Sequence, residues 1–130
     1  MSIKKITTTT LLVLALTTFG VALAKQCDDF CQEDLDRALK GDKDLAGAKL
    51  EGADLHGRDF SGADFRGAEV EKVNFQGANL SNANFRNADL EEANLKGANI
   101  KGANFSGAEL EYTIWVDGRI CAEGSVGGCW

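Results

Sequence analysis

Four cysteines are the residues of this sequence whose type and spacing most readily suggest chemistry. Cys27 and Cys31 lie near the start of the chain, and Cys121 and Cys129 lie near its end. An even number of cysteines in an oxidising compartment indicates disulfides, and three pairings of four cysteines are possible. The sequence has no C-x-x-C motif, and His56 is its only histidine. Thioredoxin-like redox chemistry and zinc binding are therefore not predicted.

No other residue set has the pattern of a catalytic site. A nucleophile needs a base beside it and a third group that orients the base. His56 has Ser61 as its nearest serine, and the pair has no evident third member. Acid–base catalysis by paired carboxylates needs a cleft that shifts their pKa values. We therefore predict that the protein is not an enzyme, with no catalytic residue, no cofactor and no metal site.

The first 24 residues have the pattern of a secretory signal peptide. Lys4 and Lys5 precede an apolar run from Leu11 to Leu16, and Ala22-Leu23-Ala24 has the form of an A-x-A cleavage site. We predict cleavage after Ala24 and export of the remaining chain. An uncleaved membrane anchor is the alternative interpretation, but the run is Thr-rich and short for a membrane span.

The charge of the chain is strongly acidic after this segment. All twenty acidic residues lie beyond Ala24, together with only twelve Lys and Arg. This excess disfavours nucleic acid and anionic membrane surfaces as direct partners. It permits a basic protein partner or a divalent cation.

From Lys43 to Asp117 the sequence repeats every five residues, fifteen times and without an insertion. The central residue of each pentad is apolar, as in Leu50, and Ala usually lies two residues before it. Neither a 3.6-residue nor a two-residue period fits, and a fixed short period predicts a solenoid. Gly or Asn closes many pentads and tolerates positive φ. Because Lys72, Glu92 and Tyr112 occupy the same closing position, we expect that not every corner requires positive φ.

This pattern resembles the pentapeptide-repeat family, whose motif is A-[DN]-L-x-x, across the whole of Lys43 to Asp117. The resemblance implies an all-β solenoid, a right-handed quadrilateral β-helix of about four coils with four pentads in each coil. The central and Ala positions would point inward, and stacked coils would lie about 4.8 Å apart. Arg58 and Val73 occupy inward Ala positions, so Arg58 must either turn sideways or distort its corner.

The resemblance and the flanking sequences divide the chain into a signal peptide at 1–24, a helical cap at 25–42, the solenoid at 43–117 and a disulfide-closed tail at 118–130. A helix is predicted over residues 28–40, with Asp29 and Gln32 at capping-box spacing and Gly41 after its end. Its apolar stripe would pack on Leu45 and the first coil: Cys27, Phe30, Cys31, Leu35, Ala38 and Leu39. Such a cap prevents end-to-end polymerisation; a partner-binding helix is the alternative.

The two ends of such a rod are nearly four coils apart, so pairing within each end is the simplest of the three disulfide arrangements. Cys121 to Cys129 would close the Gly-rich loop between them. A disulfide between Cys27 and Cys31 is geometrically less favourable, because an i,i+4 pair inside a regular helix is near the upper limit of Cα separation for a disulfide.

Residues twenty apart fall into columns when each coil holds four pentads. Phe65, Phe85 and Phe105 share an inward column and are predicted to form a ring stack. The side that contains Leu50 carries most of the outward acidic residues, and we call them the docking face: Glu51, Glu69, Glu71, Asp89, Glu91, Glu92, Glu109 and Glu111. The docking face is interpreted as a solvated surface, as a site for a basic partner, or as a weak divalent-cation ladder. A flat ladder offers few convergent oxygens, so the basic partner is favoured over the cation.

We therefore predict a non-enzymatic, exported scaffold or protein-interaction module. It would be a monomer with an unknown protein partner of basic character, without nucleic-acid or membrane contact after cleavage. Cyanobacterial pentapeptide-repeat proteins resemble it in having a signal peptide, a short solenoid and terminal cysteines, which implies a periplasm or thylakoid lumen, or secretion. The alternative is a DNA mimic that inhibits gyrase, as some family members are. The signal peptide disfavours it, because gyrase is cytosolic.

Overall fold

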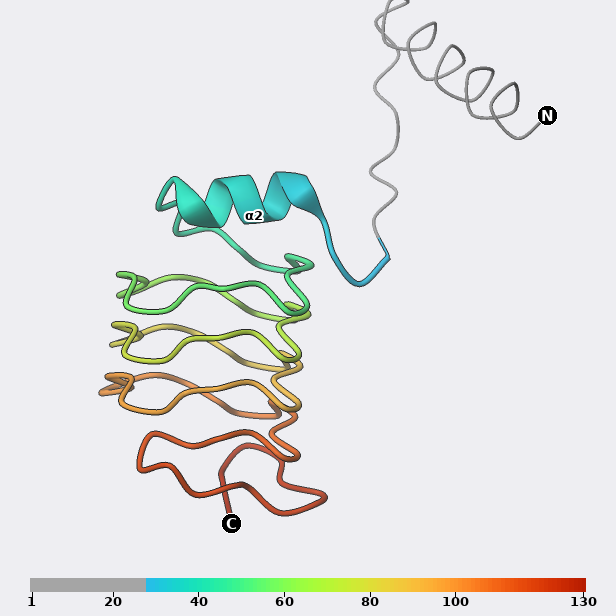
Figure 1. Cartoon of the computed structure of the whole chain (residues 1–130), viewed down its shortest axis with the longest axis vertical. Helices are drawn as coiled ribbons and strands as arrows, with labels where there is room; N and C mark the ends of the chain where they lie inside the picture. The colour runs from blue at the N-terminus through green and yellow to red at the C-terminus, as the bar shows by residue number, and fades with distance from the viewer. Residues whose placement is uncertain (1–27) are drawn as a thin grey trace, which may run out of the picture.

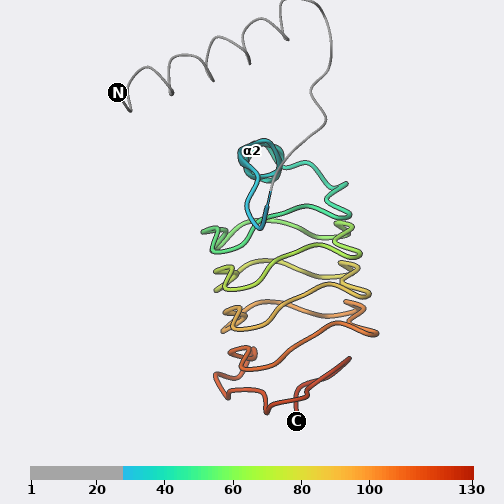
Figure 2. The same ribbon diagram turned by 90° about the vertical axis from the view of Figure 1, so that its right-hand side faces the viewer.

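The computed structural model describes residues 28–130, so the predicted signal peptide and Cys27 lie outside the described residues. Helix α2, Gln32–Leu39, lies over one end of a stack of square coils, and the C terminus lies at the other end (Figure 1, Figure 2). Within the described part, no helix combines the length and the apolar character needed to span a bilayer.

The sides of the coils are paired through single residues and not through long strands. Asp64 bridges Asn84 in parallel, and Asn84 bridges Asn104, so bridged residues are twenty positions apart. This spacing is the one that four pentads per coil require. Because the chain turns before and after each bridge, residues 28–130 contain isolated β-bridges and no named strand. The sides of the solenoid are therefore paired at single residues, whereas the predicted all-β class ordinarily has strands of several residues.

Each pentad before the last coil makes the same backbone hydrogen bonds to the coil that follows it. The Leu80 N–H donates to the carbonyl of Asn99 at 2.8 Å, and the Asn82 N–H donates to the carbonyl of Lys101 at 2.9 Å. In return, the Asn99 N–H donates to the carbonyl of Ala78 at 3.0 Å. A fourth bond, from the Ala83 N–H to the Leu80 carbonyl at 3.0 Å, closes the corner within the coil. The backbone is thus satisfied by neighbouring coils, as a buried solenoid requires.

The interior of the coils is filled by the apolar central residues and by Ala. Phe65, Phe85 and Phe105 form a parallel stack, with ring centroids 4.7 Å and 5.2 Å apart and interplanar angles of 2° in both pairs. Phe75 meets this stack edge-on, 5.7 Å from Phe65. Burial of these rings is the main favourable contribution to the fold, and their offset and edge-on geometries add to it.

Three inward positions that usually hold Ala show how the core accommodates other residues. Val73 is fully buried, and Thr113 is buried with its hydroxyl donating to the Leu90 carbonyl at 2.7 Å. Arg58 instead lies exposed, and its guanidinium donates to the Leu39 carbonyl at 3.4 Å. The arginine therefore turns out of the coil toward α2, which is the first of the two outcomes that the sequence left open.

Every pentad from Gly47 to Tyr112 has positive φ at its closing residue, so the expectation that some corners would avoid this conformation is wrong. The non-glycine corners include Lys72, Glu92 and Tyr112, with φ of 55°, 56° and 55°. The hydrogen bonds to the next coil fix the corner geometry for all residues alike. A residue with a Cβ atom in this region is disfavoured by about 1–2 kcal/mol, so these corners are strained.

Substitution of the strained corner at Glu92 by Gly should stabilise the protein. We expect the Glu92→Gly variant to raise the free energy of unfolding in urea by up to about 1 kcal/mol, because glycine adopts positive φ without steric cost, less its larger entropy loss on folding. Glu92→Ala is the matched control: it removes the same charge but keeps the Cβ atom. Equal stability of the two variants would contradict the assignment of strain.

Helix α2 begins at Gln32, four residues later than the predicted start at Asp28, and it ends at Leu39. The predicted capping box is not formed. Asp29 lies in an extended segment before the helix, because Phe30 bridges Leu50 in antiparallel fashion and the Glu51 N–H donates to the Asp29 carbonyl at 3.2 Å. Pairing with the first coil therefore replaces the first turn of the helix. Gly41 follows the helix with φ of 84°, as its predicted C-terminal role requires.

Only part of the predicted apolar stripe of the helix packs on the solenoid. Ala38 and Cys31 are buried, and Leu35 packs against the core, but Phe30 and Leu39 are 42% and 39% exposed. Leu39 is exposed because it is the last helical residue, and Phe30 because it belongs to the extended segment.

A buried carboxylate fixes α2 to the coil beneath it. Asp34 is 1% exposed, and its Oδ2 accepts the Lys49 N–H at 2.9 Å. In the later coils the equivalent N–H, for example that of Glu69, donates to a carbonyl of the preceding coil at 2.8 Å. The first coil has no such predecessor, and the Asp34 side chain supplies the missing acceptor. Arg37 lies 3.7 Å from the other oxygen of Asp34 and balances its charge.

Removal of this acceptor should lower the free energy of unfolding by more than an ordinary substitution in a helix does. We expect Asp34→Ala to lower the free energy of unfolding by roughly 2–3 kcal/mol, because the Lys49 N–H would stay buried without a partner. Asp34→Asn retains an acceptor oxygen and should lose clearly less. Denaturation in urea measures both variants, and equal losses would show that hydrogen-bond acceptance at this position is unimportant.

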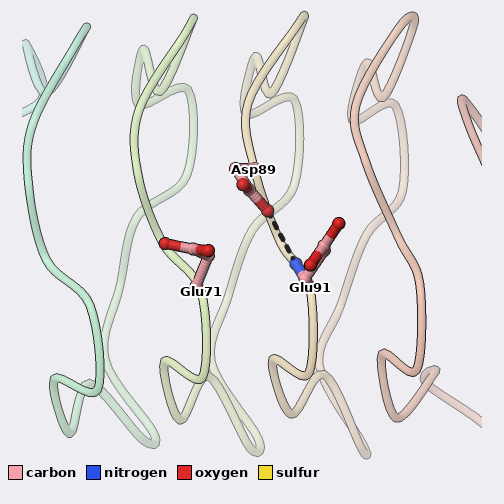
Figure 3. A group of neighbouring side chains, drawn as sticks. All are labelled: Glu71, Asp89 and Glu91. Carbon is pink, nitrogen blue, oxygen red and sulfur yellow. Dashed lines mark hydrogen bonds between the residues drawn. The ribbon is translucent and has the colours of Figure 1, made fainter. Parts of the chain in front are cut away.

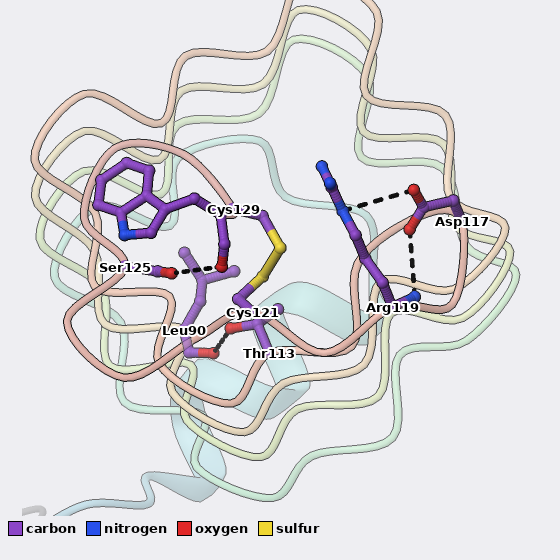
Figure 4. Close-up of a disulfide and its surroundings, with 8 residues drawn as sticks. Leu90, Thr113, Asp117, Arg119, Cys121, Ser125 and Cys129 are labelled. Atoms are coloured by element: carbon purple, nitrogen blue, oxygen red, sulfur yellow. Dashed lines mark hydrogen bonds and ion pairs between the residues drawn. A yellow bond between two sulfur atoms is a disulfide. The ribbon is translucent and has the colours of Figure 1, made fainter.

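The last residues of the chain pass under the final coil and are closed by a disulfide between Cys121 and Cys129, whose Cα atoms are 4.9 Å apart (Figure 4). This is the pairing that the sequence analysis takes as simplest for the C-terminal end. Cys121 is buried, and its N–H donates to the Thr113 carbonyl at 2.9 Å. Cys31 is also disulfide-bonded, and there is no free cysteine among the described residues.

Candidate docking face

Two columns of outward side chains make up the docking face. Lys49, Glu69, Asp89 and Glu109 are joined in succession by parallel bridges and form one column, directly before the central residues. The second column lies directly after the central residues, and Glu92 adds a carboxylate at the neighbouring corner. The structure therefore brings together, on one side of the rod, all the residues that sequence columns assigned to this face.

Two lysines neutralise the end of the docking face that lies nearest α2. The Nζ atom of Lys49 is 3.4 Å from a carboxylate oxygen of Glu69, and that of Lys72 is 3.0 Å from Glu51. Both pairs join successive coils and are partly exposed, so each is worth less than about 1 kcal/mol. The sequence showed that Lys72 offsets this charge, but it did not show which carboxylates the two lysines reach.

The middle of the docking face holds a cluster of carboxylates with no lysine between them. Glu71, Asp89 and Glu91 each place one oxygen so that all three atoms lie within 4.8 Å of one another. Figure 3 shows Glu71 on one coil and Asp89 and Glu91 on the next, with Asp89 accepting the Glu91 N–H at 3.0 Å. All three side chains are partly exposed. Like charges at this spacing repel, so the cluster opposes folding.

The pKa values of two glutamates record this repulsion. Burial raises the pKa of Glu71 above its ordinary value of 4.5, and the charges of Asp89 and Glu51 raise it further, against the opposing effect of Lys72. Burial also raises the pKa of Glu91, and Asp89 and Glu111 are the next largest contributors. Elsewhere on the rod the opposite holds, since a hydrogen bond from Arg66 lowers the pKa of Asp64. The middle of the docking face is therefore a region where negative charge is only partly compensated.

The far end of the docking face is joined to the C-terminal tail. A carboxylate oxygen of Glu111 accepts the Gly124 N–H at 2.7 Å, and Glu109 bridges Val126 in antiparallel fashion. Sequence reasoning missed both contacts, because no periodicity relates the tail to the repeat. Glu111 consequently has a structural partner, whereas the Glu71 cluster presents its carboxylates to solvent.

The residues considered for catalysis are not brought together. His56 is 67% exposed, with its Nδ1 atom 2.7 Å from Asp54, an acid two residues away on the same side of the coil. The Ser61 N–H donates to Asp59 at 2.9 Å. His56 therefore has a carboxylate neighbour but lies on the open surface. Its arrangement gives no nucleophile, base and orienting group in one place.

Carboxylate oxygens are ligands for hard divalent cations, and the Glu71 cluster offers one oxygen from each of three residues. Ca²⁺ takes six to eight oxygen ligands. The cluster supplies three oxygens within 4.8 Å of one another, half or fewer of the ligands that Ca²⁺ takes. The three carboxylates therefore form a concentration of negative charge that falls short of a complete Ca²⁺ site.

Comparison with known proteins places the repeat in a family. The family model described as pentapeptide repeats matches eight copies, over residues 44–77 and 74–111. The chain therefore belongs to the pentapeptide-repeat family. Proteins of this family are right-handed quadrilateral β-helices and are generally non-catalytic. Membership agrees with a scaffold or interaction module as the general class of function.

Several solved structures of pentapeptide-repeat proteins are similar to this chain. HetL, involved in heterocyst differentiation regulation in the cyanobacterium Nostoc sp. strain PCC 7120, is 31% identical, with 59% of this chain and 46% of HetL covered and a TM-score of 0.47. A second Nostoc protein is 29% identical, with 68% and 82% covered and a TM-score of 0.28. A protein of the Arabidopsis thaliana thylakoid lumen is 24% identical, with 66% and 79% covered and a TM-score of 0.31.

The match spans less than half the length of HetL. No curated protein matches the chain.

Removal of charge from the centre of the docking face should stabilise the protein at neutral pH. We expect Glu71→Gln and Glu91→Gln each to raise the free energy of unfolding by a few tenths of a kcal/mol, below about 1 kcal/mol, because like-charge repulsion on a solvated surface is relieved. Glu51→Gln is the matched control. It removes the same charge but breaks the pair with Lys72, so it should give no gain.

The stabilisation should depend on pH with a defined sign. Since the folded state raises the pKa of Glu71 and Glu91 above 4.5, it binds their protons more tightly than the unfolded state does. Their contribution to stability therefore falls as pH rises from about 4.5 through the raised pKa. The gain of the two variants should be full above that pKa and disappear below pH 4.5. A gain that persists at low pH would show a cause other than charge.

Proposed function

We propose that the protein is a non-enzymatic, exported scaffold whose docking face binds a basic surface of a partner protein. The observation that carries this proposal is the cluster of Glu71, Asp89 and Glu91, whose mutual repulsion Lys72 offsets only in part, since the pKa of Glu71 stays raised. A basic partner would relieve it on binding. The face is flat and rigid because each coil is hydrogen-bonded to the next, so binding would require little ordering of the backbone.

We also propose that α2 and the C-terminal tail act as caps that keep the rod from polymerising. Edge groups of a sheet are templates for pairing with other chains. The segment around Phe30 and the carboxylate of Asp34 occupy edge groups of the first coil, and the tail occupies edge groups of the last one. The covered parts of each end hinder two rods from stacking coil on coil, which favours a monomer and leaves the docking face as the larger surface for interaction.

Export to a periplasm or thylakoid lumen, or secretion, forms part of the same proposal. It rests on the basic, apolar and A-x-A segments before residue 25. The disulfide of Cys121 and Cys129 is compatible with it, because such bonds persist in oxidising compartments. Amino-terminal sequencing of the protein from its native compartment would test the predicted cleavage after Ala24.

The test of docking compares three forms of the oxidised mature chain as baits in extracts of the native compartment. One is the wild type, and the second carries Glu71→Gln, Glu91→Gln and Glu111→Gln. The third, a matched control, loses three charges on other sides of the coils through Asp54→Asn, Asp59→Asn and Asp117→Asn; all three side chains are exposed.

We expect a basic protein that the wild type and the control retain and the docking-face variant loses. With that protein purified, the docking-face variant should weaken binding by about tenfold, equivalent to ~1.4 kcal/mol, and added salt should reduce the difference. Equal binding by all three baits would leave the face as a solvated surface and refute the docking proposal.

A further inference from the structure

The tail covers only two of the four sides of the last coil. On the side of Leu110, the Leu110 N–H donates to the Ser125 carbonyl at 2.9 Å and the Tyr112 N–H to the Cys121 carbonyl at 3.1 Å. On the next side, the Trp115 N–H donates to the Arg119 carbonyl at 2.8 Å. These bonds replace the ones that a following coil would make.

The other two sides of the last coil have open backbone edges. Among the described residues, nothing pairs with the N–H groups of Ile100, Gly102 and Phe105 or with the carbonyls of Ala98 and Ala103. We call these five residues the open edge. One coil earlier, every equivalent group is bonded, for example the Phe85 N–H to the Asn104 carbonyl at 2.7 Å. The free N–H and carbonyl groups of the open edge are therefore spaced as those of the earlier coils are, and one more strand could pair with them.

The open edge is also less well covered than the coil before it. Phe105 is 8% exposed where Phe85 is fully buried, and Ala103 is partly exposed where Ala83 is buried. The tail pairs as far as the corner beside the open edge, where the Gly127 N–H donates to the Ala108 carbonyl at 2.9 Å and a Cβ on Gly127 would lie 3.6 Å from the nitrogen of Gly107. An added segment would thus continue the line of pairing that the tail starts.

A second copy of the rod does not fit the open edge as well as a single strand does. Each copy carries its own tail under two sides of its last coil, so two C-terminal ends would meet tail against tail before their open edges could pair. The opposite end of the rod is covered by α2 (Figure 1). A single extended segment, one strand thick, meets neither obstacle.

The side chains beside the open edge indicate the charge of such a segment. The exposed neighbours are Asn99, Lys101, Asn104 and Ser106, of which only Lys101 is charged. Elsewhere on the rod, lysines pair with carboxylates of the adjacent coil, as Lys49 does with Glu69 at 3.4 Å. An acidic side chain in the added segment would find Lys101 in the same relation.

We propose that the open edge binds an extended, acidic segment of a partner protein, which adds a strand to the last coil through backbone hydrogen bonds and pairs a carboxylate with Lys101. This mode of recognition gives affinity through the main chain and selectivity through side chains on either face. The site lies at the end of the rod and does not rest on the docking face, so either proposal can fail alone.

The test uses a decapeptide as the probe and the oxidised mature chain as the receptor. The probe has the sequence Ala-Asn-Ile-Glu-Gly-Ala-Asn-Phe-Ser-Gly, which copies residues 98–107 with Glu at the lysine position. It presents the backbone of a following coil and a carboxylate for Lys101. The control peptide has Pro in place of each Asn, which removes the two N–H groups that would donate to Ala98 and Ala103.

Amide NMR measures the result. Without peptide, the amides of Ile100, Gly102 and Phe105 should exchange with solvent faster than those of Leu80 and Phe85. Added probe should shift and protect the three open-edge amides in a saturable way below about 1 mM, whereas the control peptide should not. A Lys101→Glu variant, whose side chain is exposed, should weaken binding by about fivefold through charge reversal.

Three results would overturn the proposal. The first is slow exchange of the open-edge amides at low protein concentration, because it would mean that they are already paired. The second is equal binding of probe and control peptide, or no shift with either. The third is protection of the same amides by the protein itself as its concentration rises, which would assign the open edge to a second copy.

Discussion

The parallel hydrogen bonds between residues twenty apart are the constraint on which the rest of this structure depends. Each coil can bond to the next only if both contain the same number of residues, so a single insertion would move every later donor away from its acceptor. The repeat contains none between Lys43 and Asp117. The same register aligns Phe65 with Phe85 and Phe105. The second inward position holds small side chains, mostly Ala, with Val73 and Thr113 as buried exceptions.

The register also determines the surface, because it brings equivalent side chains of successive coils close together. Where those side chains are complementary, they add to stability, as in the hydrogen bond of 3.1 Å from Asn74 to Asp54. Where they are alike and charged, as in the Glu71 cluster, they repel. Among the described residues, three acidic side chains bring their oxygens within 4.8 Å of one another only in this cluster, and that concentration of charge is the basis for proposing the side as a docking face.

The ends of the rod are governed by a different requirement. A coil in the middle has neighbours above and below, but the first and last coils must obtain partners from non-repetitive segments. At the first coil, Asp34 supplies a side-chain oxygen where the repeat would supply a carbonyl. At the last coil, the disulfide-closed tail supplies the Ser125 and Cys121 carbonyls on one side, and the Arg119 carbonyl serves the next side. On the two remaining sides of the last coil, neither a side-chain oxygen nor a tail carbonyl of the described residues pairs with the N–H groups that a following coil would bond, and these sides form the open edge.

The sequence by itself determined the solenoid, the inward residues and the columns on each face, because a fixed five-residue period without insertions leaves one register. It could not determine that α2 starts at Gln32, since pairing of Phe30 with Leu50 competes with helix formation only in the folded chain. Nor could it show positive φ at Glu92, which inter-coil bonds impose against local preference. The ion pair between Lys72 and Glu51 was also decided by tertiary structure, because it joins two coils. The same is true of the open edge at Ile100, because it depends on where the tail packs under the last coil.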